Sequence, residues 1–348
     1  MKLFVNNVIG ILLVYLIISY VVSYFTPYHW GNPWYSSKIQ HLEKQDSIKF
    51  NTFFFGSSRV YRQINPYIFD STVNSISNSK IVSFNLGASA TFNPQCYFLY
   101  EKFLNSSLSK NAKYCFIELM EVDLINDFFL HQERTTYWQN YSDILYVGNS
   151  IYFDEKLSLR NKLKSSLNYS VSYIESVFHL GHFGSQINNS NFYDERFVGR
   201  GQDGFLSLDF DYETTDDEVV VEHLFERRQR ILENPKLIES RKNTVAKAYH
   251  KVSNLFDSAN LDRMLQLIEK SEQRGVQLIF ILSPRNGTQQ LVNLSNQIPA
   301  RNLIDMAEPT KYEQFYSLKN SFDLGHLNNR GAKLYSEKLG QEFRSKMN

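Results

Sequence analysis

Two short segments, one in each half of the chain, carry residue types that could perform nucleophilic catalysis. An apolar run ends at G-S-S-R, residues 56–59, and Asp323 stands three residues before His326. A serine on a tight turn after a strand exposes its hydroxyl, and an aspartate beside a histidine holds the imidazole in one tautomer. The other imidazole nitrogen is then free to deprotonate the serine. The sequence therefore predicts Ser58 as nucleophile, His326 as base and Asp323 as the partner of that base.

Two other segments are expected beside these residues. The segment N-L-G at 85–87 follows a second apolar run, and its Gly87 permits close backbone approach and can offer a free N–H. The segment E-L-M-E-V-D at 118–123 follows a third run. Ligands of a parallel α/β sheet bind beyond the carboxyl ends of its strands, so we expect all four segments at one edge of a sheet.

The elements that must position these residues follow a pattern of strand, turn and helix. Strands are predicted from apolar, β-rich runs at residues 48–55, 80–86, 114–119, 276–282 and 302–306. Helices are predicted at residues 93–104, over 244–274 as one long helix or a pair, and at 329–346. Apolar strands that alternate with helices predict an α/β domain whose parallel sheet is covered on both faces.

The middle of the chain, residues 122–243, breaks this pattern. It is rich in Tyr, Phe, Asn and Ser, with helices expected at about 155–167 and 169–180 and an acidic run at 209–222. We interpret it as a mostly helical insertion into the α/β domain.

The N-terminal segment predicts a membrane anchor. No charged residue occurs between residues 3 and 28, and residues 8–25 are almost all apolar. At about 1.5 Å rise per residue this run spans roughly 27 Å, close to the thickness of a hydrocarbon core. Aromatic residues follow where an interfacial belt would lie: Tyr24, Tyr28, Trp30, Trp34 and Tyr35.

A cleaved signal peptide and a buried core helix are the alternatives for this segment. The apolar run is longer than a usual signal-peptide core and no small-x-small cleavage site follows it, which favours a retained anchor. We therefore expect an anchor at 1–28, a polar linker at 29–46 and one domain at 47–348. A single N-terminal anchor before a large domain predicts that the domain lies outside the cytoplasm.

The composition excludes several classes of protein. The 37 Lys and Arg against 36 Asp and Glu give a net charge of +1, which provides no field to attract nucleic acid. A mean hydropathy of −0.36 argues against a multi-pass membrane protein. Two cysteines are too few for a disulfide-stapled fold. We interpret Cys96 and Cys115 as buried free thiols, with one bridge as the alternative.

Two further pairs of residues are candidates for binding a metal ion or a substrate. His179 and His182 have a spacing suited to metal ligands, but no compelling acidic or cysteine partner stands near them, so we interpret them as a structural pair. Arg59 and Arg62 flank the predicted nucleophile and either bind an anionic substrate or form ordinary ion pairs. The sequence predicts no metal and no cofactor, and it identifies no substrate-binding residue.

The combination of motifs resembles the SGNH/GDSL hydrolase superfamily. F-F-F-G-S-S-R-V at 53–60 resembles its first block and D-L-G-H-L-N-N-R-G-A at 323–332 its last. The resemblance covers residues 48–121 and 276–345. It is nearest to membrane-anchored SGNH-like proteins of bacterial envelopes that modify polysaccharides or teichoic acids, such as the D-alanyl transfer and alginate O-acetylation proteins.

The resemblance implies a fold and a set of roles. The fold is a three-layer α/β/α arrangement, flavodoxin-like, with a central parallel sheet. The nucleophile is Ser58, the oxyanion hole consists of the Ser58 and Gly87 N–H groups, and Asp323 and His326 are the acid and base. The third block departs from the family, because residues 118–123 contain no asparagine where many members have an oxyanion donor.

The resemblance also implies a function. It predicts a single-pass, extracytoplasmic serine acyltransferase or esterase that acts on O-acyl groups of a cell-envelope or exported polysaccharide. Its partner would be a multi-pass membrane O-acyltransferase that delivers the acyl group. The alternative is a non-catalytic SGNH-fold subunit for glycan binding or assembly, which the missing asparagine favours and the Ser, Asp and His residues disfavour. An intracellular lipase-like enzyme is a third hypothesis, which the anchor opposes.

Overall fold

The computed structural model describes residues 2–45, 49–75, 80–122, 130–155, 157–189, 192–251, 253 and 255–347. The chain forms two compact units. The first comprises Met1–Ser36 and Leu124–Tyr193, and the second comprises Ser37–Asp123 and Asp194–Asn348. The segment interpreted as an insertion, 122–243, is thus divided: its part from 124 to 193 belongs to the first unit and its part from 194 to the second.

The second unit is built on a five-stranded sheet in which every neighbouring pair is parallel. The strands are β1 (Thr52–Phe55), β2 (Ser83–Asn85), β3 (Tyr114–Glu118), β4 (Gln277–Leu282) and β5 (Leu303–Asp305), in the order β2-β1-β3-β4-β5. The predicted α/β class with a parallel sheet is confirmed, and each strand lies within its predicted run. In this order the chain reverses direction across the sheet between β1 and β3, which is where open α/β sheets bind ligands.

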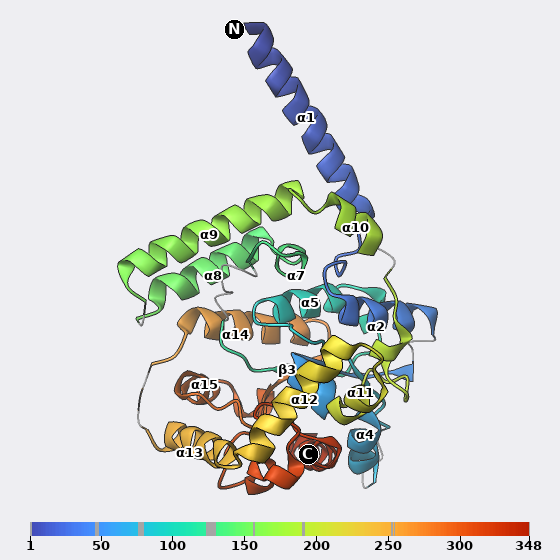
Figure 1. The fold of residues 1–348 in the computed structure, drawn as a ribbon, viewed down its shortest axis with the longest axis vertical. Helices are drawn as coiled ribbons and strands as arrows, with labels where there is room; N and C mark the ends of the chain where they lie inside the picture. Colours follow the sequence, from blue (N-terminus) through green and yellow to red (C-terminus); the bar gives the residue numbers. More distant parts are fainter. Residues whose placement is uncertain are drawn as a thin grey trace. The chain divides into compact units, whose positions relative to one another are not determined.

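Helices cover both faces of this sheet. Successive side chains of a strand point to opposite faces, so Phe54 of β1 packs against Phe69, while its neighbours Phe53 and Phe55 pack against Phe103. In Figure 1, α5 and α14 lie above β3, and α4 and the C-terminal helix α16 lie below it. These helices are α4 (Pro66–Asn74), α5 (Gln95–Leu104), α14 (Ser258–Glu272) and α16 (Asn329–Met347).

Shorter and peripheral helices complete the second unit. They are α3 (Ser58–Gln63), α11 (Leu208–Thr214), α12 (Glu218–Glu233), α13 (Lys236–His250) and α15 (Gln289–Ser295). The helix predicted over 244–274 is a pair, α13 and α14, and the predicted terminal helix is α16. Among the described residues of 194–243 there is no strand, and helices α11 and α12 make up much of the segment.

The expected polar linker differs from the structure, because most of it is helix α2 (Pro33–Lys44). Ile39 and Leu42 are buried, and so is Lys38, which donates to the Gly87 carbonyl and lies 3.8 Å from the centre of the Tyr61 ring. Burial first, and then the nearby Arg62, lowers the pKa of Lys38 well below its ordinary value. The prediction of a linker was wrong, because the apolar residues of this segment have helical spacing despite its polar composition.

The first unit is helical throughout its described elements. It contains α1 (Lys2–Phe25), α7 (Glu133–Thr136), α8 (Tyr141–Phe153), α9 (Leu159–Phe178) and α10 (Phe183–Asn189). Within α1, the 22 residues Phe4–Phe25 are long and apolar enough to cross a membrane. The two helices expected at 155–167 and 169–180 are one, α9, which ends where His179 adopts the left-handed conformation, with φ of 54°.

Candidate active site

Ser58 lies on a tight turn between β1 and α3. Its neighbour Ser57 is the N-cap of α3 and accepts a hydrogen bond from the Arg59 N–H at 3.2 Å. Gly56 allows the strand to enter this turn, because a Cβ there would lie 2.4 Å from Val60 Cγ2 and 2.7 Å from Glu118 Cβ. The local sequence G-S-S therefore places Ser58 at the carboxyl end of β1, as predicted.

Glu118 anchors this turn from the end of the neighbouring strand β3. Its carboxylate is fully buried and accepts from the Ser57 N–H at 2.8 Å, the Ser57 hydroxyl at 2.7 Å and Arg59 Nε at 2.6 Å. Hydrogen bonds to an ionised group are stronger than those between neutral groups. Glu118 thus fixes the residues on both sides of Ser58, a role that sequence reasoning missed.

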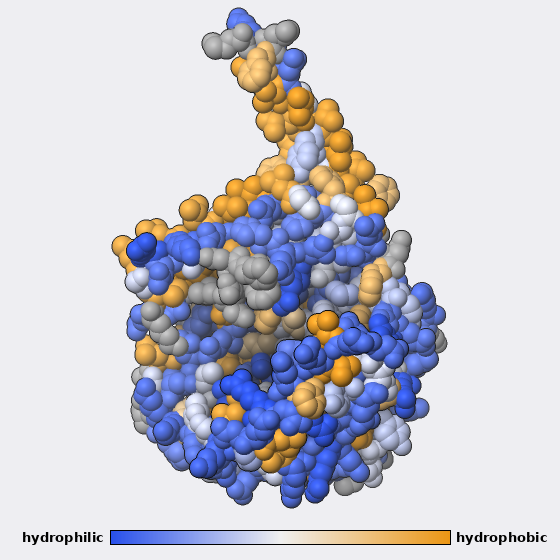
Figure 2. All heavy atoms as spheres, in the orientation of Figure 1, coloured by the Kyte–Doolittle hydropathy of each residue, from blue (hydrophilic) through white to orange (hydrophobic). Residues whose placement is uncertain are grey.

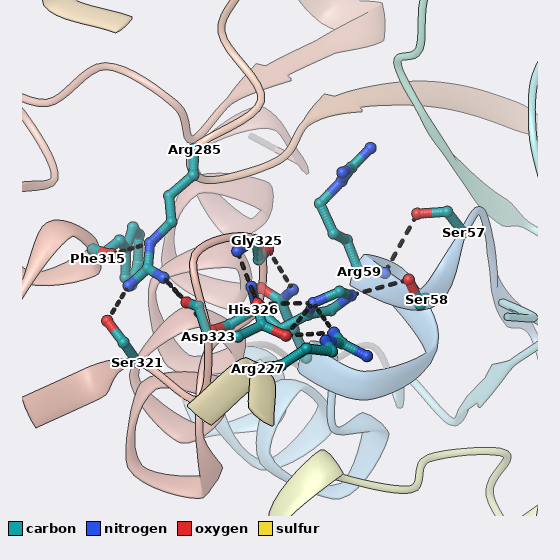
Figure 3. Close-up of polar contacts among 11 residues, drawn as sticks. Ser57, Ser58, Arg59, Arg227, Arg285, Phe315, Ser321, Asp323, Gly325 and His326 are labelled. Atoms are coloured by element: carbon teal, nitrogen blue, oxygen red, sulfur yellow. Dashed lines mark hydrogen bonds and ion pairs between the residues drawn. The ribbon is translucent and has the colours of Figure 1, made fainter. Parts of the chain in front are cut away.

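Asp323 and His326 lie on one turn before α16. One carboxylate oxygen of Asp323 accepts from the N–H groups of Gly325 and His326, each at 2.7 Å. His326 Nδ1 is 3.0 Å from that same oxygen, and His326 Nε2 is 2.9 Å from Ser58 Oγ (Figure 3). With the ring proton on Nδ1, Nδ1–H donates to the carboxylate and Nε2 accepts from the serine hydroxyl. The three predicted residues therefore lie together in a nucleophile–base–carboxylate chain.

Arg227 is a fourth member of this cluster. It comes from α12, and its Nη2 donates to the second carboxylate oxygen of Asp323 and lies 3.0 Å from His326 Nδ1 (Figure 3). Both of these nitrogens carry hydrogen in the tautomer described above, so Arg227 acts on His326 as a nearby cation. Sequence reasoning missed Arg227, because no local motif connects α12 with a turn almost a hundred residues later.

The electrostatics of the cluster keep the base neutral and the carboxylate ionised. Burial alone would raise the pKa of Asp323, but His326, Arg227 and the Gly325 N–H hold that pKa well below its usual range. Burial lowers the pKa of His326 below its ordinary value of 6.5. Asp323 opposes that shift, whereas Arg227 and Arg59 add to it. At neutral pH the imidazole is therefore ready to accept a proton.

The buried side chain of Arg285 supports the turn that contains Asp323. Its buried guanidinium donates to the Asp323 carbonyl at 2.9 Å, the Phe315 carbonyl at 2.7 Å and the Ser321 hydroxyl (Figure 3). Burial lowers the pKa of Arg285 to about 10, which leaves it a cation at neutral pH. A buried charge satisfied by three backbone or hydroxyl oxygens fixes the geometry of the turn.

The two backbone N–H groups predicted to form an oxyanion hole differ in their partners. The Ser58 N–H donates to no other group among the described residues and is available to an oxyanion. The Gly87 N–H is not, because it donates to Asn85 Oδ1 at 2.9 Å in an Asx turn. Gly87 is needed instead for packing, since a Cβ there would lie 2.7 Å from the Tyr61 nitrogen. The prediction that Gly87 offers a free N–H is therefore wrong.

The two arginines that flank Ser58 both form ion pairs. Arg62 Nη2 lies 2.7 Å from Asp211 of α11, and Arg59 pairs with Glu118. Arg59 also lines a cleft of about 220 Å³. Its other lining residues are Phe92, Asn93, Met120, Glu121, Val122, Asn286, Thr288 and Leu291. This cleft places a mixed polar and apolar space next to the turn that carries Ser58.

Other predicted groups lie outside this cluster. His179 contacts Ser23 and Gln186 within the first unit. Within the described ranges, no three His, Cys, Asp or Glu side chains form a group that could hold a metal ion. Cys96 and Cys115 are buried free thiols. Of the segment 118–123, residue 123 lies outside the described residues.

Comparisons of the chain with protein-family models, with curated proteins and with solved structures found no match. The fold and the site nevertheless define a class of protein: a parallel α/β protein with a Ser58–His326–Asp323 chain at the carboxyl edge of its sheet. Any narrower assignment depends on the chemistry that this arrangement can perform.

Proposed function

We propose that this protein is a membrane-anchored, SGNH-like serine enzyme that transfers or removes O-acyl groups on a cell-envelope or exported polysaccharide. One observation carries the proposal: Ser58 Oγ is 2.9 Å from His326 Nε2, and His326 Nδ1 is 3.0 Å from Asp323. Distances of this size between nucleophile, base and carboxylate are those of catalytic triads.

The proposed reaction begins with attack on an acyl ester. As Ser58 Oγ bonds to the carbonyl carbon, its proton passes to His326 Nε2, and Asp323 stabilises the imidazolium that forms. The Ser58 N–H donates to the oxyanion of the tetrahedral intermediate. The C–O bond to the leaving alcohol then breaks, and that alcohol takes the proton from His326, leaving an acyl ester on Ser58.

The second half of the reaction releases the acyl group. Water or a sugar hydroxyl gives its proton to His326 and bonds to the acyl carbon, and the bond to Ser58 Oγ breaks as the serine recovers the proton. Water makes the enzyme an esterase, and a sugar hydroxyl makes it a transferase. The cleft beside Arg59 is the space that we assign to the acyl group.

The strand order and the helices support the SGNH assignment. The order β2-β1-β3-β4-β5 is the flavodoxin-like order, and helices pack on both faces as in a three-layer α/β/α fold. The sequence resemblance adds the two motif blocks that contain Ser58 and His326. In this interpretation the sheet and its covering helices are the SGNH domain, and the helices between β3 and α13 are its insertion.

The apolar helix α1 supports a single-pass anchor. We place the rest of the chain outside the cytoplasm, as expected when a single N-terminal anchor precedes a large domain. Such a placement suits an envelope glycan as substrate and a multi-pass O-acyltransferase as the partner that delivers the acyl group. Alkaline phosphatase matures only in an oxidising compartment, so its fusion after Lys44 should give high activity. Low activity, together with activity of a cytoplasmic reporter at the same site, would reverse the orientation.

The alternative is a non-catalytic subunit that binds a glycan or assembles an acylation complex. The observation that favours it is the Gly87 N–H, which is already bonded to Asn85 and leaves the oxyanion hole with one fewer backbone donor. Loss of one such donor raises a reaction barrier by about 2.7–4 kcal/mol in a serine protease.

Covalent labelling of the full chain in detergent micelles distinguishes the two hypotheses. A fluorophosphonate should label Ser58, and Ser58→Ala should lose both the label and the hydrolysis of p-nitrophenyl acetate. Ser71→Ala is the matched control, because the Ser71 hydroxyl is exposed on α4 and donates to the Ile68 carbonyl at 3.1 Å. A wild-type chain that neither labels nor hydrolyses the ester would support the binding subunit, and an active Ser58→Ala would refute the nucleophile.

A further inference from the structure

Helix α9 of the first unit exposes an apolar stripe along its length. The residues recur every three or four positions, so they share one face of the helix. Leu159 is 73% exposed, Leu163 64% and Leu167 65%, and the stripe continues through Val171, Ile174 and Val177. Isolated exposed leucines are ordinary on soluble proteins, but a continuous stripe of this kind marks an interaction surface.

The opposite face of α9 packs against the rest of the unit and is largely polar, with Tyr169 as its buried aromatic residue. Ser172 is fully buried, donates to the Leu130 carbonyl at 2.6 Å and accepts from Gln139 Nε2 at 3.0 Å. Ser176 donates to the Thr136 carbonyl at 2.6 Å. A helix on a protein surface in water buries its leucines and exposes its serines. Helix α9 exposes its leucines and buries Ser172, so its outer face suits an apolar medium better than water.

The C-terminal end of α9 is attached to the apolar helix α1. Tyr15 Oη and Ser19 Oγ both donate to the Phe178 carbonyl, at 2.5 Å and 3.2 Å, and Ser23 contacts His179. Ser19 precedes the end of α1 by six residues, which is about 9 Å along the helix axis. If α1 crosses a bilayer, the end of α9 therefore lies at the depth of the outer leaflet and not above the membrane.

We propose that the stripe of α9 lies in the interfacial layer of the bilayer that α1 crosses, as a second membrane contact of the chain. The inference rests on the proposed anchor. Lipid is the proposed occupant, because in Figure 2 the apolar surface of α1 continues onto the edge formed by α9, within the same unit. The exposed Arg160 and Lys164 lie beside the stripe, where they suit anionic headgroups.

Two exposed aromatic residues extend this surface. Tyr152 is 70% exposed and Phe153 59% exposed at the end of α8, next to the loop that leads into α9. Aromatic side chains of this kind favour the boundary between headgroups and acyl chains. A helix held at one end by a membrane span and lined with leucines along its length suits a bilayer surface better than a compact partner site.

Lipid-depth quenching on the full chain tests the proposal. The two natural cysteines are buried, so a fluorophore would react with a cysteine introduced at Leu163. The protein is reconstituted into vesicles of phosphatidylcholine with a minority of phosphatidylglycerol and spin-labelled lipid. The matched control is Leu265→Cys, an exposed leucine 40% accessible on α14 of the second unit, and Val14→Cys reports on the anchor.

The expected result is a severalfold larger loss of fluorescence to spin-labelled lipid at position 163 than at 265, with iodide quenching in the reverse order. Quenching by lipid at 14 but not at 163 would overturn the inference and leave the anchor intact. Absence of lipid quenching at both 14 and 163 would overturn both. Position 163 protected from iodide and from lipid alike would indicate a second copy as occupant, and would also overturn it.

Discussion

Both compact units bury an apolar core, and they differ in the stripe of leucines that α9 of the first unit leaves exposed. The second unit buries its aromatic core, including Phe54, Phe116 and Phe343, and the polar groups that it buries near its site are bonded to one another. The first unit exposes the leucines of α9 and buries Ser172. Side chains sort according to the medium that surrounds them, so the exposed stripe agrees with the membrane contact proposed above for α9.

The polar groups at the site of the second unit differ in kind from those that hold α9 in the first unit. In the second unit, Glu118, Asp323 and Arg285 are charged groups, each held by several hydrogen bonds, and they lie around the turns that carry Ser58 and His326. In the first unit, Ser172 and Ser176 are small neutral donors that attach one helix to its neighbours. The charged groups of the second unit fix the geometry of its site, whereas the hydroxyls of Ser172 and Ser176 hold α9 against its neighbours.

The largest expected effect tests whether the charged cluster of the second unit is a catalytic unit. Asp323→Asn retains an oxygen for the Gly325 and His326 N–H groups, so the turn should persist. Turnover of an acyl ester should fall by up to about four orders of magnitude, as for the matching change in a serine-protease triad. His326→Ala should cost at least as much, because it removes the base.

The double variant sharpens this test. If Asp323 acts through His326, Asp323→Asn combined with His326→Ala should turn over little more slowly than His326→Ala alone. The measurement is kcat for the full chain, with circular dichroism as the check on folding. Losses that add would show that Asp323 acts elsewhere, and the site would reduce to a Ser58–His326 dyad.

The second prediction compares one leucine from each unit. Leu339 of α16 is fully buried, so Leu339→Ala should lower the free energy of unfolding by about 2–5 kcal/mol. Leu163 is 64% exposed, so Leu163→Ala should change it by no more than about 0.5 kcal/mol. Urea unfolding of the full chain in micelles measures both. Equal losses would mean that α9 is covered by the protein and would remove the contrast between the units.

The smallest expected effect concerns the pH dependence of the site. Burial lowers the pKa of His326 and Arg227 adds to that shift, so the neutral base persists to a pH below 6.5 and activity is lost as pH falls through the lowered pKa. Arg227→Gln removes that cation and should move the acid limb of kcat/KM to higher pH. Arg227→Lys, which keeps the charge, is the control. A limb that does not move would show that Arg227 only supports the turn.

Local signals account for what could be predicted. Strands of a covered parallel sheet are continuous apolar runs, and a serine after one run and a D-x-x-H turn before the last helix are visible within a few residues. What the sequence did not reveal depends on long-range contacts. Arg227 reaches Asp323 from a helix 96 residues earlier, and the Gly87 N–H turns inward because the Asn85 side chain accepts it. No local sequence pattern predicts either contact.

Helix α2 has a practical consequence for any shortened form of this protein. Lys38 lies within α2 and provides the buried donor to the Gly87 carbonyl, and Ile39 and Leu42 pack inside the second unit. A cut within residues 38–46 would remove that donor and expose the apolar surface beneath it. A shortened form that keeps the packing of the second unit must therefore retain Lys38 and the residues of α2 that follow it.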